Sequence, residues 1–145
     1  MIFPFSRAES VWSKTSAPCT REWLEAQLNS ESVKATIAKL RTTENHDERG
    51  ELKKKLPIII PMAVITEGKK RNASNVEALS GYVMTDFDHV STDRDELMRI
   101  YKERIEPHID ELGVKMVFIS PSGDGLKVLS TMKIINEKNG GIKND

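Results

Sequence analysis

The stretch VKMVFISPSGDGLKVLSTM, residues 114–132, places two apolar runs on either side of a short turn that is rich in serine and glycine. Large apolar and β-branched residues fill both runs, as is typical of strands, and glycine-containing loops are the commonest hairpin connections. We therefore predict strands over residues 114–120 and 126–134, joined by a tight turn over 121–125.

The segment before this hairpin carries the strongest helix signal in the chain. In residues 91–112, Thr92 and Asp95 have the spacing of a capping box, and apolar residues recur at helical intervals. Pro107 is expected to kink or divide this helix, and Gly113 suits its C-terminal cap.

The first half of the chain reads as mostly helical. Thr20 and Ser30 are expected to cap two helices, and residues 45–56 read as a weak helix or a solvated linker. Residues 2–5 are predicted to be an edge strand, because Pro4 disfavours a central one. The whole pattern predicts an α+β fold, in which helices pack on one face of a sheet and a mostly helical N-terminal segment precedes it.

Length and composition narrow the class of protein. We expect one domain over residues 1–135, made of a helical part (1–50) and a sheet-containing core (51–135), with a disordered tail over 136–145. The 22 basic and 22 acidic residues exclude a chain-wide basic field but not a local patch, and the single cysteine excludes a disulfide framework. Without a signal-peptide pattern or a membrane-spanning apolar run, we expect a cytoplasmic protein with no membrane partner.

Two carboxylates, Asp86 and Asp88, end the strand predicted over residues 81–88. Side chains at i and i+2 of a strand share a face, so this pair could hold a hard cation such as Mg²⁺ or Mn²⁺ through oxygen ligands. The alternative is that each acid is simply solvated at the end of the strand, which is the commoner situation for an isolated D-x-D.

The turn after the next strand is a candidate phosphate site. Glycine lets backbone N–H groups approach a phosphate closely, serine hydroxyls add donors, and lysine adds a positive charge. The alternative is an ordinary hairpin turn. The candidate residues are Ser120, Ser122, Gly123, Gly125 and Lys127.

Two basic segments, Lys53–Lys55 and Lys69–Arg71, flank the proline-containing apolar stretch. If both come together they form a local patch that could contact phosphates, whereas taken singly each reads as solvated charge at a loop end.

The acidic pair and the glycine turn are expected to lie at the same end of the sheet. In a strand–helix–strand unit the two strands are parallel and usually adjacent, so their C-terminal ends lie at the same end of the sheet. A metal held by Asp86 and Asp88 would then face the phosphate-binding turn, an arrangement suited to nucleotide chemistry.

These pieces resemble the VirE N-terminal domain family, which comprises primase-like domains of bacterial mobile-element proteins related to archaeo-eukaryotic primases. The resemblance spans roughly residues 50–131 and is carried by Lys53-x-x-Leu56-Pro57, the strand ending in Asp86-x-Asp88, and Ser120-x-Ser122-Gly123-x-Gly125-Leu126-Lys127.

The resemblance implies a primase-like sheet with a role in DNA replication. Asp86 and Asp88 would be catalytic metal ligands, and the Ser-Gly turn with Lys127 would bind the phosphates of a nucleoside triphosphate. Lys53 and Arg71 would contact template or nucleotide. Single-stranded DNA and a helicase module would be the partners.

The chain departs from the superfamily pattern after the glycine turn. Lys127 replaces the usual histidine, and only Glu137 and Asp145 follow as acids, so a third catalytic acid is missing and catalysis is left open. Two alternatives therefore stand beside a nucleotide- and metal-binding domain. One is a non-catalytic DNA-binding or assembly module, and the other is a haloacid-dehalogenase-like phosphatase, for which Val90 and Ser91 are a poor match.

Overall fold

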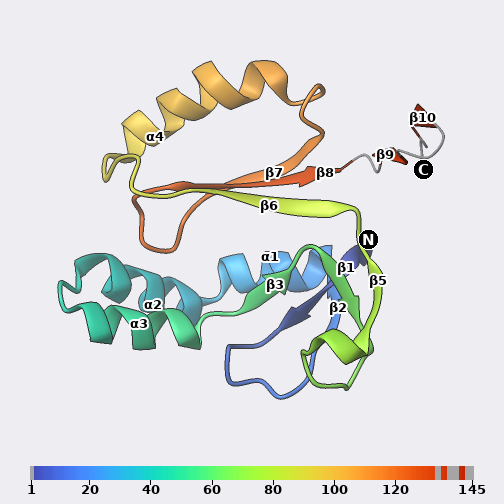
Figure 1. Ribbon diagram of the computed structural model, residues 1–145. Coiled ribbons are helices and arrows are strands. Elements are labelled where there is room, and N and C mark those ends of the chain that lie inside the picture. The colour runs from blue at the N-terminus through green and yellow to red at the C-terminus, as the bar shows by residue number, and fades with distance from the viewer. Residues whose placement is uncertain (1, 133–134, 137–140, 143–145) are drawn as a thin grey trace. The chain divides into compact units, whose positions relative to one another are not determined.

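The computed structural model describes residues 2–132, 135–136 and 141–142. The chain divides into two compact units, each described by itself below (Figure 1). The first contains Met1–Ser80 and Pro121–Gly123, and the second contains Gly81–Ser120 and Asp124–Asp145.

The first unit is richer in strands than expected. Its three-stranded antiparallel sheet has the order β2-β1-β3, and a separate antiparallel pair joins β4 to β5. The strands are β1 (Ile2–Ala8), β2 (Ala17–Thr20), β3 (Ile58–Ile60), β4 (Ala63–Ile65) and β5 (Val76–Leu79). The expectation of a mostly helical N-terminal segment is therefore wrong for the first twenty residues.

Strand β1 is central in its sheet although it contains Pro4. Its pairing with β3 covers only Ser6 to Ala8, and its register with β2 shifts between Ile2 and Ser6. Proline is tolerated in a sheet where the ladder is interrupted, because no hydrogen bond is then lost for want of an N–H. The prediction of an edge strand failed because the sequence does not show where this irregularity falls.

Three helices follow β2, namely α1 (Arg21–Asn29), α2 (Glu31–Thr42) and α3 (His46–Lys55), and a short 3₁₀ turn, η1 (Ala73–Asn75), precedes β5. The predicted caps are confirmed: the Thr20 hydroxyl accepts from the Trp23 N–H at 3.1 Å, and the Ser30 hydroxyl accepts from the Val33 N–H at 3.4 Å. The weakly predicted segment is a true helix, α3, capped by Asn45. Helices α2 and α3 bury a cluster formed by Leu40, Leu52 and Leu56.

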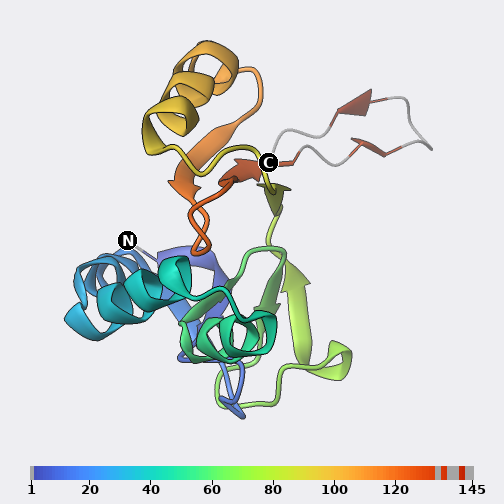
Figure 2. The same cartoon turned by 90° about the vertical axis from the view of Figure 1, so that its left-hand side faces the viewer.

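The second unit is a three-stranded sheet with a helix on one face (Figure 2). Its strands are β6 (Tyr82–Phe87), β7 (Val114–Ile119) and β8 (Leu126–Thr131), and its helical stretch comprises α4 (Arg94–Ile100), η2 (Tyr101–Ile105) and η3 (Glu106–His108). The order is β6-β8-β7 with antiparallel neighbours, so β6 and β7 run parallel with β8 between them. The predicted hairpin is confirmed. Strands β6 and β7 were expected to be adjacent, but β8 lies between them.

The long helix forms within the predicted range, but it begins later, ends earlier and contains irregular turns. Asp93, not Thr92, is the N-cap, since its carboxylate accepts from the Asp95 N–H at 2.9 Å. The α-helical geometry gives way to a π-helical turn over Tyr101–Ile105 and a 3₁₀ turn that contains Pro107. Leu97 and Ile105 of the helical stretch and Leu126 and Val128 of β8 are buried together and form the core of this unit.

A short antiparallel pair, β9 (Ile135–Asn136) with β10 (Gly141–Ile142), follows. Most of the tail expected to be disordered, residues 136–145, lies outside the described residues. Within the residues that are described, no helix is both long enough and apolar enough to cross a bilayer. The fold is thus mixed α and β, with antiparallel sheets.

Candidate functional site

The end of β6 and the turn between β7 and β8 meet at one end of the second unit's sheet. Phe87 lies opposite Leu126, which in turn lies opposite Ile119 on the other side of β8. The C-terminal ends of β6 and β7 therefore share one end of the sheet, as predicted, because both strands are antiparallel to the same partner.

Asp86 and Lys127 are direct cross-strand partners. The ammonium of Lys127 lies 2.7 Å from a carboxylate oxygen of Asp86, and the two side chains are 25% and 45% exposed. An ion pair this exposed contributes about 0–1 kcal/mol, so it can open without a large loss of stability. The predicted metal ligand and the predicted phosphate ligand are thus in contact with each other.

Asp88 lies just beyond the strand, where the chain turns sharply. His89 has a φ of +54°, which is a left-handed conformation. The N–H groups of Val90 and Ser91 both donate to the Asp124 carbonyl, at 2.7 and 3.2 Å. Among the described residues, none makes a hydrogen bond or ion pair with the Asp88 carboxylate, so this acid is exposed and available on a loop that is itself held in place.

Asp124 also fastens the loop through its side chain. One carboxylate oxygen lies 2.8 Å from Nδ1 of His89, and the other accepts from the buried Ser120 hydroxyl at 3.4 Å. Burial raises the pKa of Asp124. The hydrogen bond and charge of His89, a backbone hydrogen bond and the Ser120 hydroxyl all lower it, and together they outweigh burial. The pKa of Asp124 is therefore below its ordinary value. Asp124 bonds to both partners, so no Ser-His-Asp relay forms, because that relay places the histidine in the middle.

Asp124 was not among the residues proposed from the sequence. It lies inside the quoted turn, between the two glycines, and an acid in a tight turn commonly bonds to nearby backbone. The feature that distinguishes it is a long-range pairing with the loop after β6, which has no local signature.

The two glycines of the turn have structural reasons to be glycine. Gly123 has a φ of +82°, and a Cβ on Gly125 would lie 2.2 Å from the carbonyl oxygen of Phe87. The Ser120 N–H donates to the Gly125 carbonyl at 2.9 Å and closes the turn. Ser122 is half-buried, and it is grouped with Gly123 in the first unit.

Lys53 and Arg71 belong to the first unit. Lys53 is exposed in the last turn of α3. The guanidinium of Arg71 donates to the carbonyls of Val11 and Ser13, at 2.6 and 3.0 Å. Arg71 therefore holds the loop between β1 and β2 in this structure.

The carboxylates fit a shared cation better than a dedicated metal centre. Among the described residues, no group of three or more His, Cys, Asp or Glu side chains is placed to hold a metal ion. Mg²⁺, however, is commonly bound by one or two carboxylates, while water and substrate phosphates complete its shell. Asp86 and Asp88 meet that smaller requirement.

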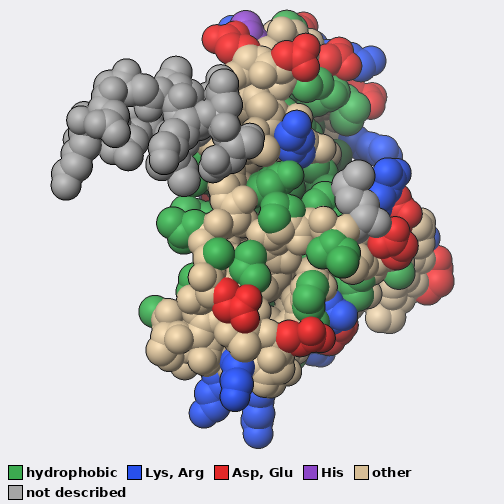
Figure 3. All heavy atoms as spheres, turned by 90° about the vertical axis from the view of Figure 1, so that its right-hand side faces the viewer, with side chains coloured by type: hydrophobic (Ala, Val, Ile, Leu, Met, Phe, Trp, Pro, Cys, Tyr) green, Lys and Arg blue, Asp and Glu red, His purple; other side chains and the backbone are tan. Residues whose placement is uncertain are grey.

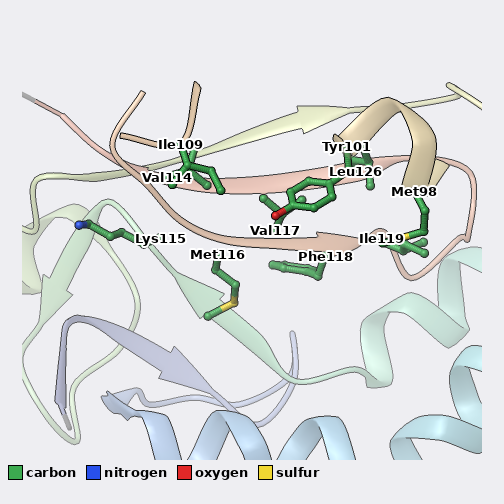
Figure 4. A pocket seen from close by; sticks show the side chains of 10 residues that line it. All are labelled: Met98, Tyr101, Ile109, Val114, Lys115, Met116, Val117, Phe118, Ile119 and Leu126. Atoms are coloured by element: carbon green, nitrogen blue, oxygen red, sulfur yellow. The ribbon is translucent and has the colours of Figure 1, made fainter. Parts of the chain in front are cut away.

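A hollow of about 400 Å³ lies beside β7 in the same unit (Figure 4). Figure 4 shows Tyr101 and Val117 directed into it, while Met116 and Phe118 point toward the other face of the sheet. Apart from Lys115 its lining is uncharged, so it offers no carboxylate for a cation. The polar end of the sheet is the better candidate for a site that binds a charged ligand.

A sequence model of the BT4734-like, N-terminal domain matches residues 51–142, which is more than half of the chain. The chain therefore belongs to the BT4734-like N-terminal domain family. The comparisons with curated proteins and with solved structures find no match. The assignment to the VirE N-terminal domain family is wrong, because the matching family is a different one. The primase relationship, the mobile-element setting and the replication role fall with that resemblance.

Proposed function

We propose that the polar end of the second unit's sheet binds a nucleoside triphosphate together with Mg²⁺ or Mn²⁺. The observation that carries this proposal is the contact of Lys127 with Asp86, two residues before the unpaired carboxylate of Asp88. A cation site and a phosphate contact then lie next to each other. The proposal rests on this geometry and needs no primase-like fold.

Ligand binding exchanges the partners of the Asp86–Lys127 pair. Asp86 and Asp88 hold the cation, whose other ligands are phosphate oxygens and water, and Lys127 turns from the carboxylate to the phosphates. The exchange costs little because the pair is partly exposed. The cation supplies neutralisation of the triphosphate charge, and catalysis lies outside the proposal.

Asp124 acts as the positioning residue of this site. Its backbone carbonyl and its carboxylate together hold the loop that follows Asp88. That loop carries no regular structure of its own, so its conformation depends on these bonds. The acidic pair is thereby presented on a pre-formed turn, which lowers the entropy cost of closing around a cation.

The test is calorimetric titration of ATP into the full chain in the presence of Mn²⁺. Wild-type protein is expected to bind, and Asp88→Asn is expected to lose the metal-dependent part of the affinity. Asp110→Asn, an exposed acid elsewhere in the same unit, is the matched control and should bind like wild type. Absence of binding to wild type, or equal loss in the control, would refute the proposal.

A second variant separates the metal from the phosphate contact. Lys127→Met removes the ammonium that now neutralises Asp86, so Mn²⁺ alone should bind more tightly than to wild type. The same variant should bind the nucleotide–Mn²⁺ complex more weakly, because the phosphates lose their positive partner. If Lys127→Met strengthened both affinities, or weakened both, the exchange of partners would be contradicted.

A further inference from the structure

The loop between β1 and β2, residues 9–16, is held in a defined turn by hydrogen bonds within the first unit. The Ser13 N–H donates to the Ser10 carbonyl, and the Trp12 N–H donates to the Ser10 hydroxyl, both at 3.2 Å. This turn places Trp12 at its tip, where the side chain is 55% exposed. Tryptophan is enriched at interfaces, so an exposed indole on an ordered loop is a candidate contact residue.

The two basic segments noted in the sequence both meet this loop. The Val11 N–H donates to the Lys54 carbonyl at 3.2 Å, and the Val11 carbonyl accepts from Arg71 at 2.6 Å. Lys70 forms an isolated β-bridge with Thr15. The two segments therefore meet through the loop, with Val11 joining them.

This convergence forms a surface that we call the basic loop surface, defined as Trp12, Lys14, Lys53, Lys55, Lys69 and Lys70. All six side chains are exposed. Figure 3 shows Lys and Arg side chains gathered at the lower end of the view, the end at which Figure 1 places these loops of the first unit. Since the chain has zero formal net charge, such a local excess reflects segregation of charge.

Two acids near this surface are paired with other cations, whereas Glu67, two residues before Lys69, is exposed and forms no ion pair with a described residue. Glu51 lies 2.6 Å from the ammonium of Lys54, and Glu9 pairs with Arg7. None of the five lysines of the basic loop surface forms an ion pair with a residue that the structure describes. Their charges are therefore free to meet an anionic partner.

The two tryptophans of the chain differ in a way that singles out Trp12. Trp23 lies under the guanidinium of Arg7, 4.6 Å from the ring centroid. Within the described part of the chain, no ring or cation contacts the indole of Trp12. With 55% of its surface exposed, Trp12 is available for stacking against a planar ligand.

We propose that the basic loop surface binds single-stranded nucleic acid, with a base stacked on Trp12 and the backbone phosphates on the surrounding lysines. Stacking on an aromatic side chain requires an unstacked base, which a duplex does not offer. Lysines around the aromatic residue supply contacts that do not depend on sequence. This site lies in the first unit and is separate from the nucleotide site proposed above.

The experiment is fluorescence anisotropy of a labelled oligothymidylate of about 20 nucleotides, longer than typical single-strand site sizes. It is done in EDTA, so failure of the metal-dependent site cannot affect it. Lys69→Glu/Lys70→Glu should weaken binding at least tenfold and flatten the dependence of log affinity on log salt by about 1.4, or 0.7 per lost phosphate contact. Lys102→Glu/Lys115→Glu changes the charge equally on exposed sites of the other unit and should have little effect.

Trp12 is tested separately, because a polyanion site without stacking would also respond to charge. Trp12→Ala should weaken binding about 5- to 100-fold, and Trp12→Phe should restore much of it. In Trp23→Phe, where Trp12 is the remaining tryptophan, the oligonucleotide should quench the fluorescence.

Three outcomes would overturn the proposal. One is equal loss of binding in the two charge-reversed double variants, since that would indicate net charge alone. Another is unchanged affinity in Trp12→Ala together with equally tight binding of heparin, which would indicate a general polyanion surface. The third is preferential binding to vesicles of anionic phospholipid, which would indicate a membrane contact.

Discussion

Replacing Gly125 with alanine should disrupt the junction between the turn and the end of β6. The new Cβ would lie 2.2 Å from the carbonyl oxygen of Phe87, whereas ordinary contacts begin at 3.4 Å. Because both neighbours are backbone, the two segments must separate by about 1.2 Å to restore contact distance. No side-chain rotation can relieve the clash.

The size of the effect follows from what that movement breaks. Taken up along the bond, it would lengthen the Val90 N–Asp124 O distance from 2.7 Å to about 3.9 Å, beyond hydrogen-bonding range. The Ser91 bond to the same carbonyl would be lost as well, at about 1 kcal/mol for each bond. Alanine restricts the unfolded chain and returns about 0.4–1 kcal/mol. We expect a net loss of about 1–2 kcal/mol.

Urea unfolding followed by circular dichroism measures this loss, and amide hydrogen exchange localises it. The amides of Val90 and Ser91 should exchange faster in Gly125→Ala. Gly50→Ala is the matched control: its Cβ meets nothing within 4 Å, and it lies inside α3, so it should stabilise by about 0.5–1 kcal/mol. A Gly125→Ala variant as stable as wild type, with protected amides, would refute the close approach.

Two further predictions concern titratable groups. Burial raises the pKa of the Cys19 thiol to about 11, and Arg7 opposes this with a smaller lowering effect. Cys19 should therefore resist Ellman's reagent at pH 8 until urea unfolds the chain. Rapid labelling of the native protein would contradict the burial of this thiol. The pKa of Asp124 is lowered by folding, so its contribution to stability is present above the ordinary value of 3.8 and is lost as the pH falls through the lowered value. Asp124→Asn should therefore be less stable than wild type at pH 6, by a margin that shrinks below pH 4 in urea titrations; a constant margin would show that the charge is not responsible.

Much of the local structure could be predicted because its causes are local. The Thr20 and Ser30 caps act over three residues, and both appear where the sequence places them. The hairpin of β7 and β8 follows from two apolar runs around a glycine turn. Strand β5 was missed because its four residues, Val-Glu-Ala-Leu, include one β-branched residue and are too few to show a strand pattern.

The candidate site was predicted only in part, because its contacts join residues that are far apart in the sequence. Asp86 and Lys127 were both proposed, yet their contact depends on β8 pairing directly with β6. A sequence of strand, helix, strand and strand permits the last strand to lie beside either of the others or between them. Asp124 escaped notice because its main partner, His89, is 35 positions away.

The chain's own residues decide where helices begin, where the hairpin turns and which side chains could carry charge, because capping, periodicity and glycine conformations act between neighbours in sequence. Tertiary packing decides which of those charges meet. It sets Lys127 against Asp86 and brings Arg71 to Val11 across 60 positions. Such pairings follow from burial of apolar surface and closure of long loops, whose free energy depends on the whole fold and not on the sequence at either end.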